Sequence, residues 1–249
     1  MPSPAQEAVK DLIRVRADLK TDRRRSIQRV KAFLLKAGMR YPRKTSGWSG
    51  AFEAWVSGLT CGQACAQEAL DHLLDCVHTR QVQLQALDRR IEELATTDDV
   101  LREPVARLRV LKGIDTLAAA TIAAEVGDFA AFARAASFMG FTGLVPGEHS
   151  SGERTHRTSI TKTGNQHVRR ILVEAAWAYR HRPAIGAKLR RRQEGLPTDL
   201  IAYSWSAQLR LTARYRKLAA TKQDNVAGTA VARELAGFVW GVMTQKYAS

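Results

Sequence analysis

The first forty residues alternate apolar and polar positions with the period of an α-helix. Between Pro4 and Met39 the apolar residues recur at three, four or seven to eight residues, which is the spacing of one helix face. Arg16 and Arg23 interrupt this face. The pattern predicts one long helix that ends before the Pro-, Gly- and Ser-containing stretch 41–50, with a short amphipathic helix after it. The apolar residues of the long face are Val9, Leu12, Leu19, Ile27, Val30 and Leu34.

A second long helix is predicted from about Gly62 to Ala95. Its apolar positions follow alternating steps of three and four, and Arg80 fills the one polar step. Two long helices joined by a loop predict an antiparallel helical arm. Two interpretations stay open: a hairpin that packs on its own domain, or a projecting coiled-coil arm through which the chain forms a homo-oligomer. The apolar positions are Val77, Leu84, Leu87, Ile91 and Leu94.

Residues 96–99 form a polar break, and the layout after them is that of a helix-hairpin-helix. A helix, a tight turn at 112–115 and an alanine-rich helix follow one another. Such hairpins bind DNA phosphates through backbone N–H groups, so Lys112 and Gly113 are candidate DNA-binding residues. Asp115 stands where the usual motif has a second glycine; it is a good N-cap for a helix that starts at Thr116, but its charge lies near the phosphate. DNA binding and plain helix packing both stay open.

Composition narrows the partners that this chain can have. The 249 residues include 39 Lys and Arg against 24 Asp and Glu, a formal charge of +15 that favours a phosphate-rich partner. The 45% of hydrophobic residues predicts a folded core. Three cysteines without a signal peptide predict a reducing cytosol, small buried thiols, no disulfide and no metal site. No stretch reaches the roughly 18 apolar residues of a membrane span, so a soluble cytoplasmic protein is expected.

The positive charge gathers between residues 154 and 192, where Glu174 is the only acid. A solvated helix face normally mixes charges of both signs, so this run predicts contact with a phosphate backbone. It begins in a polar loop, 147–165, which supplies small side chains just before a strongly helical segment and so resembles an anion site. The candidate DNA-binding residues of this region are Arg154, Arg157, Lys162, Gly164, Asn165, Arg169 and Arg170.

The same loop contains Ser150 and Ser151, followed by Gly152. On the residues alone, a serine pair in a polar loop is usually a turn. No Ser-His-Asp triad can be identified from spacing. Four of the six histidines fall between His149 and His181, without a recognisable metal-ligand spacing.

Two blocks in order resemble a known family. The sequences FMGFTGLVPGEHSSGE and ITKTGNQHVRRILVEAAW, preceded by LKGIDTLAAATIAAEVGDF, are similar to the C-terminal domain of bridge-RNA-guided transposases of bacterial insertion sequences, the insertion-sequence one-ten family, relatives of the pilin-gene invertases. The resemblance covers about Leu108 to the end, and PSPAQEAVKDLIRVRADL resembles that family's linking helix. It implies a serine nucleophile that attacks a DNA phosphodiester, which falls on Ser151, and a guide RNA as a partner.

The resemblance also implies a part that this chain is not expected to contain. In the family, an N-terminal ribonuclease-H-like domain with three aspartates and a glutamate (DEDD) holds magnesium. This chain starts in the linking helix, so it is expected to bind no metal or other cofactor itself, with Mg²⁺ in the missing domain. Alone it should bind nucleic acid but cut poorly. A non-catalytic DNA- or RNA-binding protein and a decayed transposase remnant are the competing interpretations.

The expected architecture is mostly all-α. A helical arm or linker over 1–99 should precede a helix-hairpin-helix over 100–130 and a basic, serine-bearing domain over 131–249. The expected location is the cytoplasm of a bacterium, associated with the nucleoid, with DNA as partner and no membrane.

Overall fold

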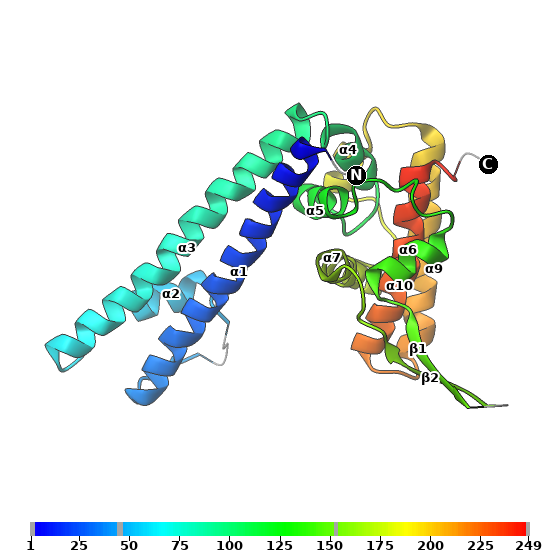
Figure 1. Ribbon diagram of the computed structural model, residues 1–249. Coiled ribbons are helices and arrows are strands. Elements are labelled where there is room, and N and C mark those ends of the chain that lie inside the picture. Colours follow the sequence, from blue (N-terminus) through cyan, green and yellow to red (C-terminus); the bar gives the residue numbers. More distant parts are fainter. Residues whose placement is uncertain (1–2, 44–46, 152–153, 248–249) are drawn as a thin grey trace. The chain divides into compact units, whose positions relative to one another are not determined.

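The computed structural model describes residues 3–43, 47–151 and 154–247. For residues 148–151 and 154–158 it describes the backbone but not the side chains. The described chain is mostly helical, with one antiparallel pair of strands, β1 (Pro146–Ser151) and β2 (Arg154–Ile160), which confirms the expected fold class (Figure 1). A 3-10 turn, η1, spans Trp177–Arg180. The helices are α1 (Pro4–Lys36), α2 (Gly50–Ser57), α3 (Ala64–Thr97), α4 (Arg102–Leu108), α5 (Thr116–Val126), α6 (Ala135–Thr142), α7 (Gln166–Ala176), α8 (Ala187–Gln193), α9 (Thr198–Ala219) and α10 (Asp224–Thr244).

The chain divides into two compact units. Residues 11–90 form one, here called the arm unit, and residues 1–10 together with 91–249 form the other, the main unit. The division falls inside α1 and α3. It differs from the three predicted domains, 1–99, 100–130 and 131–249, whose independence as folding units stays a prediction.

The arm unit is held together by one apolar core. Residues of α1, α2 and α3 meet in it, and Phe52 of α2 lies at its aromatic end, where the rings of Tyr41, Trp48 and Trp55 surround it at 5.1–5.5 Å. An ion pair between Arg16 and Asp88 joins α1 to α3. The core residues are Ile27, Val30, Leu34, Phe52, Val56, Leu70, Leu74 and Val77.

These contacts make α1 and α3 antiparallel neighbours, as the helical periodicity predicted. Arg16, near the start of α1, pairs with Asp88, near the end of α3, whereas Leu34 and Leu70 share the core at the other ends. Leu84 is buried within the chain and Leu87 is half-buried. Much of the predicted apolar face is therefore covered internally, and pairing of the arm with a second copy stays a prediction.

The main unit is built around α10. This helix contacts α4, α6, α7 and α9, and its buried face includes Val231, Leu235 and Val239. By length and composition α10 could span a membrane, which the sequence analysis did not expect of any segment. Its central role in packing, with half of its most apolar window buried, fits a core helix equally well. The apolar character of α10 is therefore weak evidence for a membrane.

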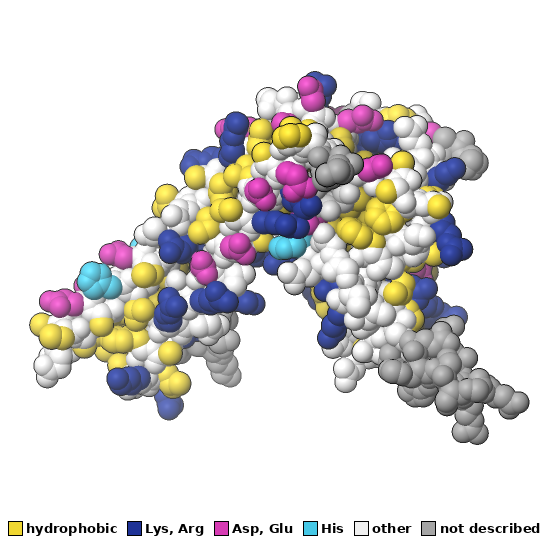
Figure 2. All heavy atoms as spheres, in the orientation of Figure 1, with side chains coloured by type: hydrophobic (Ala, Val, Ile, Leu, Met, Phe, Trp, Pro, Cys, Tyr) yellow, Lys and Arg dark blue, Asp and Glu magenta, His cyan; other side chains and the backbone are white. Residues whose placement is uncertain are grey.

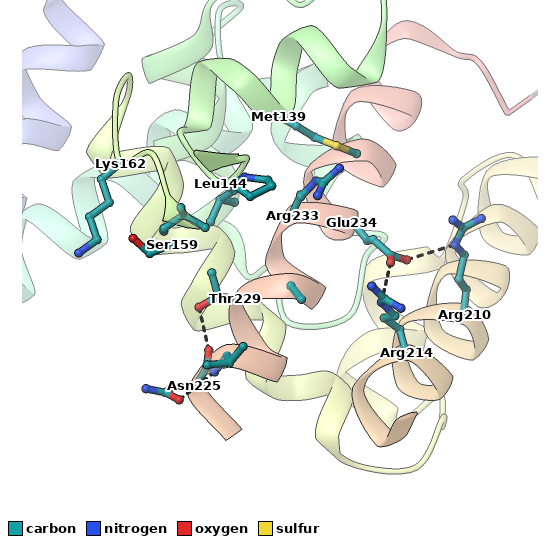
Figure 3. Close-up of a pocket in the computed structure, with 14 residues that line it drawn as sticks. Met139, Leu144, Ser159, Lys162, Arg210, Arg214, Asn225, Thr229, Arg233 and Glu234 are labelled. Carbon is teal, nitrogen blue, oxygen red and sulfur yellow. Dashed lines mark hydrogen bonds and ion pairs between the residues drawn. The ribbon is translucent and has the colours of Figure 1, made fainter. Parts of the chain in front are cut away.

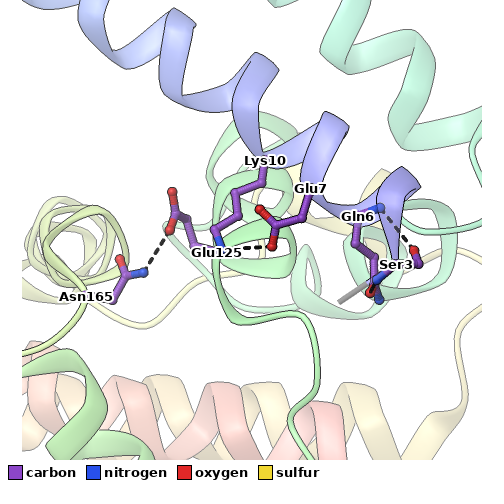
Figure 4. Close-up of polar contacts among 6 residues, drawn as sticks. All are labelled: Ser3, Gln6, Glu7, Lys10, Glu125 and Asn165. Atoms are coloured by element: carbon purple, nitrogen blue, oxygen red, sulfur yellow. Dashed lines mark hydrogen bonds and ion pairs between the residues drawn. The ribbon is translucent and has the colours of Figure 1, made fainter. Parts of the chain in front are cut away.

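The start of α1 also belongs to the main unit, and a reciprocal pair of hydrogen bonds fixes it. The Ser3 backbone N–H donates to Gln6 Oε1 at 2.8 Å, and the Gln6 N–H donates to Ser3 Oγ at 3.2 Å (Figure 4). This is a capping box, and Pro4 occupies the first helical position, where its missing N–H costs nothing. The sequence S-P-A-Q thus sets the first residue of the helix.

Two expectations need correction. Part of the polar loop 147–165 forms the hairpin β1–β2, because alternating Thr and Ser positions in RTHRTSI favour a strand as well as a loop. The cysteines are free, as expected, but Cys65 and Cys76 are exposed rather than buried. Both cysteines lie on α3, outside the apolar face that the sequence pattern predicted for this helix.

Candidate nucleic-acid interface

The turn between α4 and α5 contains the N-cap that the sequence predicted for α5, and the helix-hairpin-helix assignment stays a prediction. Asp115 caps α5, since its carboxylate accepts a hydrogen bond from the Ala118 N–H at 2.8 Å. Gly113 adopts φ +87°, and a side chain there would collide with the Ala175 carbonyl of α7. Glycine is therefore required for close packing of the turn on α7. This gives Gly113 a structural role, and its contact with phosphate stays a prediction.

Lys112 is held in the same turn by a tertiary contact. Its Nζ donates to the backbone carbonyl of Arg182 at 3.1 Å, and partial burial lowers the pKa of its ammonium group below the ordinary value. The lysine thus connects the turn to the segment that follows η1. A phosphate at this turn would have to share the ammonium group with that carbonyl.

The loop before α7 is packed on the end of α6. Gly143 is the C-cap of α6, and the Asn165 N–H donates to the Phe141 carbonyl at 2.9 Å. Gly164 has φ +83°, and a side chain there would overlap the Phe141 carbonyl. Lys162 also has a positive φ, +56°, and its side chain is exposed. Of the two predicted residues, Gly164 serves loop closure and Lys162 faces solvent.

Asn165 uses both ends of its side chain. Its Oδ1 accepts from the Val168 N–H at 3.0 Å and so caps α7, while its Nδ2 donates to Glu125 Oε2 at 2.8 Å (Figure 4). Glu125 is only 5% exposed. The side chain therefore links the start of α7 to the end of α5.

The two adjacent arginines of α7 also contact the protein. Arg169 Nη1 donates to the Thr142 carbonyl at 3.0 Å and to the Thr163 carbonyl at 3.3 Å, which fixes the loop against α6. Arg170 Nε is buried without a hydrogen-bond partner among the described residues. Replacing both would disturb the loop itself, so this pair is a poor probe of phosphate binding.

The later part of the basic run is better placed for a phosphate backbone. It begins at the last residue of η1 and continues through the following segment onto α8, a short helix whose buried residues are Leu189 and Gln193. Its exposed cations are Arg180, Arg182, Lys188, Arg190 and Arg191.

The predicted nucleophile lies on the hairpin. Ser151 is the last residue of β1, and the strand register places Arg154 directly opposite it and Arg157 opposite Glu148. The side chains of Ser151, Arg154 and Arg157 lie outside the described residues. The backbone thus brings Ser151 and Arg154 together.

A cavity of about 760 Å³ opens beside the root of this hairpin (Figure 3). Sequence reasoning missed most of it, because it concentrated on residues before 193. The signal was present: Arg210 and Arg214 stand four apart on α9, and the lining residues of α10 follow steps of three and four. The cavity is lined by Met139, Leu144, Pro146, Ser159, Ile160, Lys162, Arg210, Arg214, Asn225, Val226, Thr229, Ala230, Arg233 and Glu234.

Candidate metal ligands do not gather in the described part of the chain. Among the described residues, no group of three or more His, Cys, Asp or Glu side chains could hold a metal ion. These residues therefore do not fit the magnesium that the family resemblance implies.

Comparison with known proteins adds a family to this geometry. Residues 105–190 match the model of the Transposase IS116/IS110/IS902 family. That range covers α4 to the start of α8, and with them the hairpin and the loop before α7. Residues 105–190 are therefore similar to a transposase domain of this family.

The relatives are transposases by name. The chain is 41% identical to the putative transposase y4qE of Sinorhizobium fredii, over 97% of this chain and 58% of that protein. It is 30% identical to the transposase for insertion sequence element IS1533 of Leptospira borgpetersenii, over 87% of this chain and 63% of that protein. It is 26% identical to the transposase for insertion sequence element IS1328 of Yersinia enterocolitica, over 96% of this chain and 64% of that protein. The chain thus spans about three fifths of the length of these relatives.

Proposed function

We propose that this chain, whose homologues are insertion-sequence transposases, is the DNA-binding and nucleophile-bearing part of such an enzyme. The observation that carries the proposal is the position of the matched domain, which coincides with the hairpin and most of the one-sign basic run. In this role the chain binds DNA, has a guide RNA as a second partner, and acts in transposition and site-specific recombination.

The chemistry that we propose begins at Ser151. Its hydroxyl oxygen loses its proton and attacks a DNA phosphorus, and the bond from phosphorus to one strand oxygen breaks. That oxygen leaves with the electron pair and takes up a proton to become a free strand hydroxyl, while the phosphate-bearing end stays attached as a phosphoserine ester. Negative charge grows on the phosphate oxygens during attack. Arg154, opposite Ser151 in the strand register, is the nearest cation by backbone position to balance it.

This step needs a base or a metal, and among the described residues no group of three or more His, Cys, Asp or Glu could hold a metal ion. A serine hydroxyl is a weak nucleophile without a base or a metal. The relatives extend well beyond the matched region, and the family resemblance assigns a magnesium-binding DEDD domain to the remainder. We therefore propose that the chain cleaves DNA only when such a domain is supplied.

The binding half of the proposal is tested through its salt dependence. On duplex DNA the log-log slope of affinity against salt should change by about 0.9 for each phosphate that the protein no longer neutralises. Replacing Arg190 and Arg191 with alanine should therefore flatten the slope by about two and weaken all sequences alike. The matched control replaces Arg216 and Lys217, two basic residues of α9 outside the run, and should leave the slope unchanged. Equal effects of the two double variants would contradict a specific phosphate path along α8.

A further inference from the structure

The cavity beside the hairpin combines an apolar lining with cations. Its apolar lining includes Leu144 from the connection between α6 and β1, Ile160 from β2 and Val226 from α10. The cavity lies at the root of the hairpin, because its lining residues Pro146 and Ile160 are paired there in the strand register. At about 3.3 Å per strand residue, Ser151 lies roughly 17 Å further along β1. The cavity is therefore distinct from the predicted nucleophile.

The charged groups of the cavity are unevenly engaged. Glu234 is the one carboxylate among its described lining residues, and it pairs with Arg210 at 3.3 Å and with Arg214 at 3.1 Å. Arg233 is exposed and makes no hydrogen bond or ion pair with any other described residue. Figure 3 shows Arg210 and Arg214 converging on Glu234, with Arg233 apart from them. Arg233 thus offers a guanidinium group to a ligand without breaking an existing pair.

We propose that this cavity binds a single unstacked nucleotide of a nucleic-acid strand, with the base against the apolar lining and the phosphate at Arg233. The volume lies within the roughly 300–1,000 Å³ of ligand sites. A free anion would not need the apolar lining, and an apolar ligand would not need Arg233. A nucleotide needs both. The inference rests on the proposed function, since a strand held by the domain delivers the nucleotide.

The cost of extruding a base fits such a site. Removing a base from a duplex stack costs free energy, which is offset by contact of the base with apolar side chains and by hydrogen bonds. Thr229 and Asn225, on the same wall of α10, add polar groups that can contact base edges. A deoxynucleotide and a ribonucleotide both carry the base and the phosphate that these residues would contact. The experiment below compares the affinities of the two.

The test uses methyl-labelled methionine in the full chain. Met139 lines the cavity, whereas Met39 and Met243 do not and serve as internal controls. Titration with deoxyadenosine monophosphate should shift the Met139 methyl resonance and leave the other two unchanged. Deoxyadenosine and inorganic phosphate should each bind at least about tenfold more weakly, because each lacks one of the two recognised groups. Comparing deoxyadenosine and adenosine monophosphates then assigns the strand.

Two variants separate charge from shape. Arg233→Ala should weaken monophosphate binding by roughly tenfold, as expected when one charge-assisted hydrogen bond is removed. Val226→Trp should block the cavity without changing its charge; Val226 is 50% exposed, so the larger ring fits without a buried clash. Arg216→Ala is the matched control on a surface outside the cavity and should change nothing. Far-UV circular dichroism checks that all three variants are folded.

The outcomes distinguish this inference from the proposed function. If inorganic phosphate shifts Met139 as strongly as the monophosphate does, the site is only an anion site and the nucleotide proposal is wrong. An equal shift by deoxyadenosine would remove the role of Arg233. Salt-dependent DNA binding without any Met139 shift overturns the cavity proposal alone. Absence of DNA binding by the folded chain overturns the proposed function.

Discussion

Asn165 offers the sharpest test of whether a predicted DNA-binding residue is in fact structural. Asn165→Ala removes the N-cap of α7, which contributes about 1 kcal/mol, and the hydrogen bond to the buried Glu125 carboxylate, which contributes about 1.5–3 kcal/mol. The free energy of unfolding should therefore fall by about 3 kcal/mol. Urea unfolding followed by far-UV circular dichroism measures this, since the chain is mostly helical.

A conservative variant separates the two contributions. Asn165→Asp keeps a capping oxygen but places a second carboxylate against Glu125, so it should also destabilise the chain at neutral pH. Adding Glu125→Gln restores a donor and an acceptor across the contact and should recover most of the stability, giving a coupling energy in a double-mutant cycle. An Asn165→Ala cost below about 0.5 kcal/mol, together with weaker DNA binding by folded protein, would refute the structural interpretation.

Two further predictions concern stability and assembly. Tyr179 is fully buried with no hydrogen-bond partner for its hydroxyl among the described residues, so Tyr179→Phe should stabilise the chain by about 1 kcal/mol in urea unfolding; destabilisation by that amount would show a partner. Burial raises the pKa of Tyr179, so the free energy of unfolding is independent of this group below about pH 10, its unfolded pKa, and falls as the pH rises from there toward the higher folded pKa. The variant should lack that alkaline decline. If the arm pairs two chains, Leu87→Asp should convert a dimer to a monomer in light scattering, and a monomeric wild-type chain would contradict arm pairing.

The fold could be predicted from the sequence where the signal is local. Helical periodicity located α1 and α3, and Asp115 was correctly identified as the cap of α5, because both depend on residues within one or two turns. The hairpin β1–β2 was missed, since strand pairing depends on which segment lies opposite, and polar Thr and Ser positions fit loops and strands alike.

The candidate site was only partly accessible to the same reasoning. Sequence charge identified the basic run, but it could not show that Arg169 binds two backbone carbonyls or that Asn165 contacts Glu125, 40 residues away. The cavity arginines on α9 and α10 join the hairpin root only through tertiary packing. Long-range contacts decided which cations remain available to a ligand.

The most direct test of the account is a covalent adduct on Ser151. The full chain, incubated with DNA and magnesium, should give no cleavage alone. After addition of the DEDD domain and guide RNA of a closely related transposase, mass spectrometry of protease digests should find a DNA-linked phosphoserine at Ser151. Ser151→Ala should remove the adduct and keep salt-dependent binding, and Ser150→Ala should change neither. Cleavage by the chain alone, or an adduct at Ser150 or Ser159, would contradict the account.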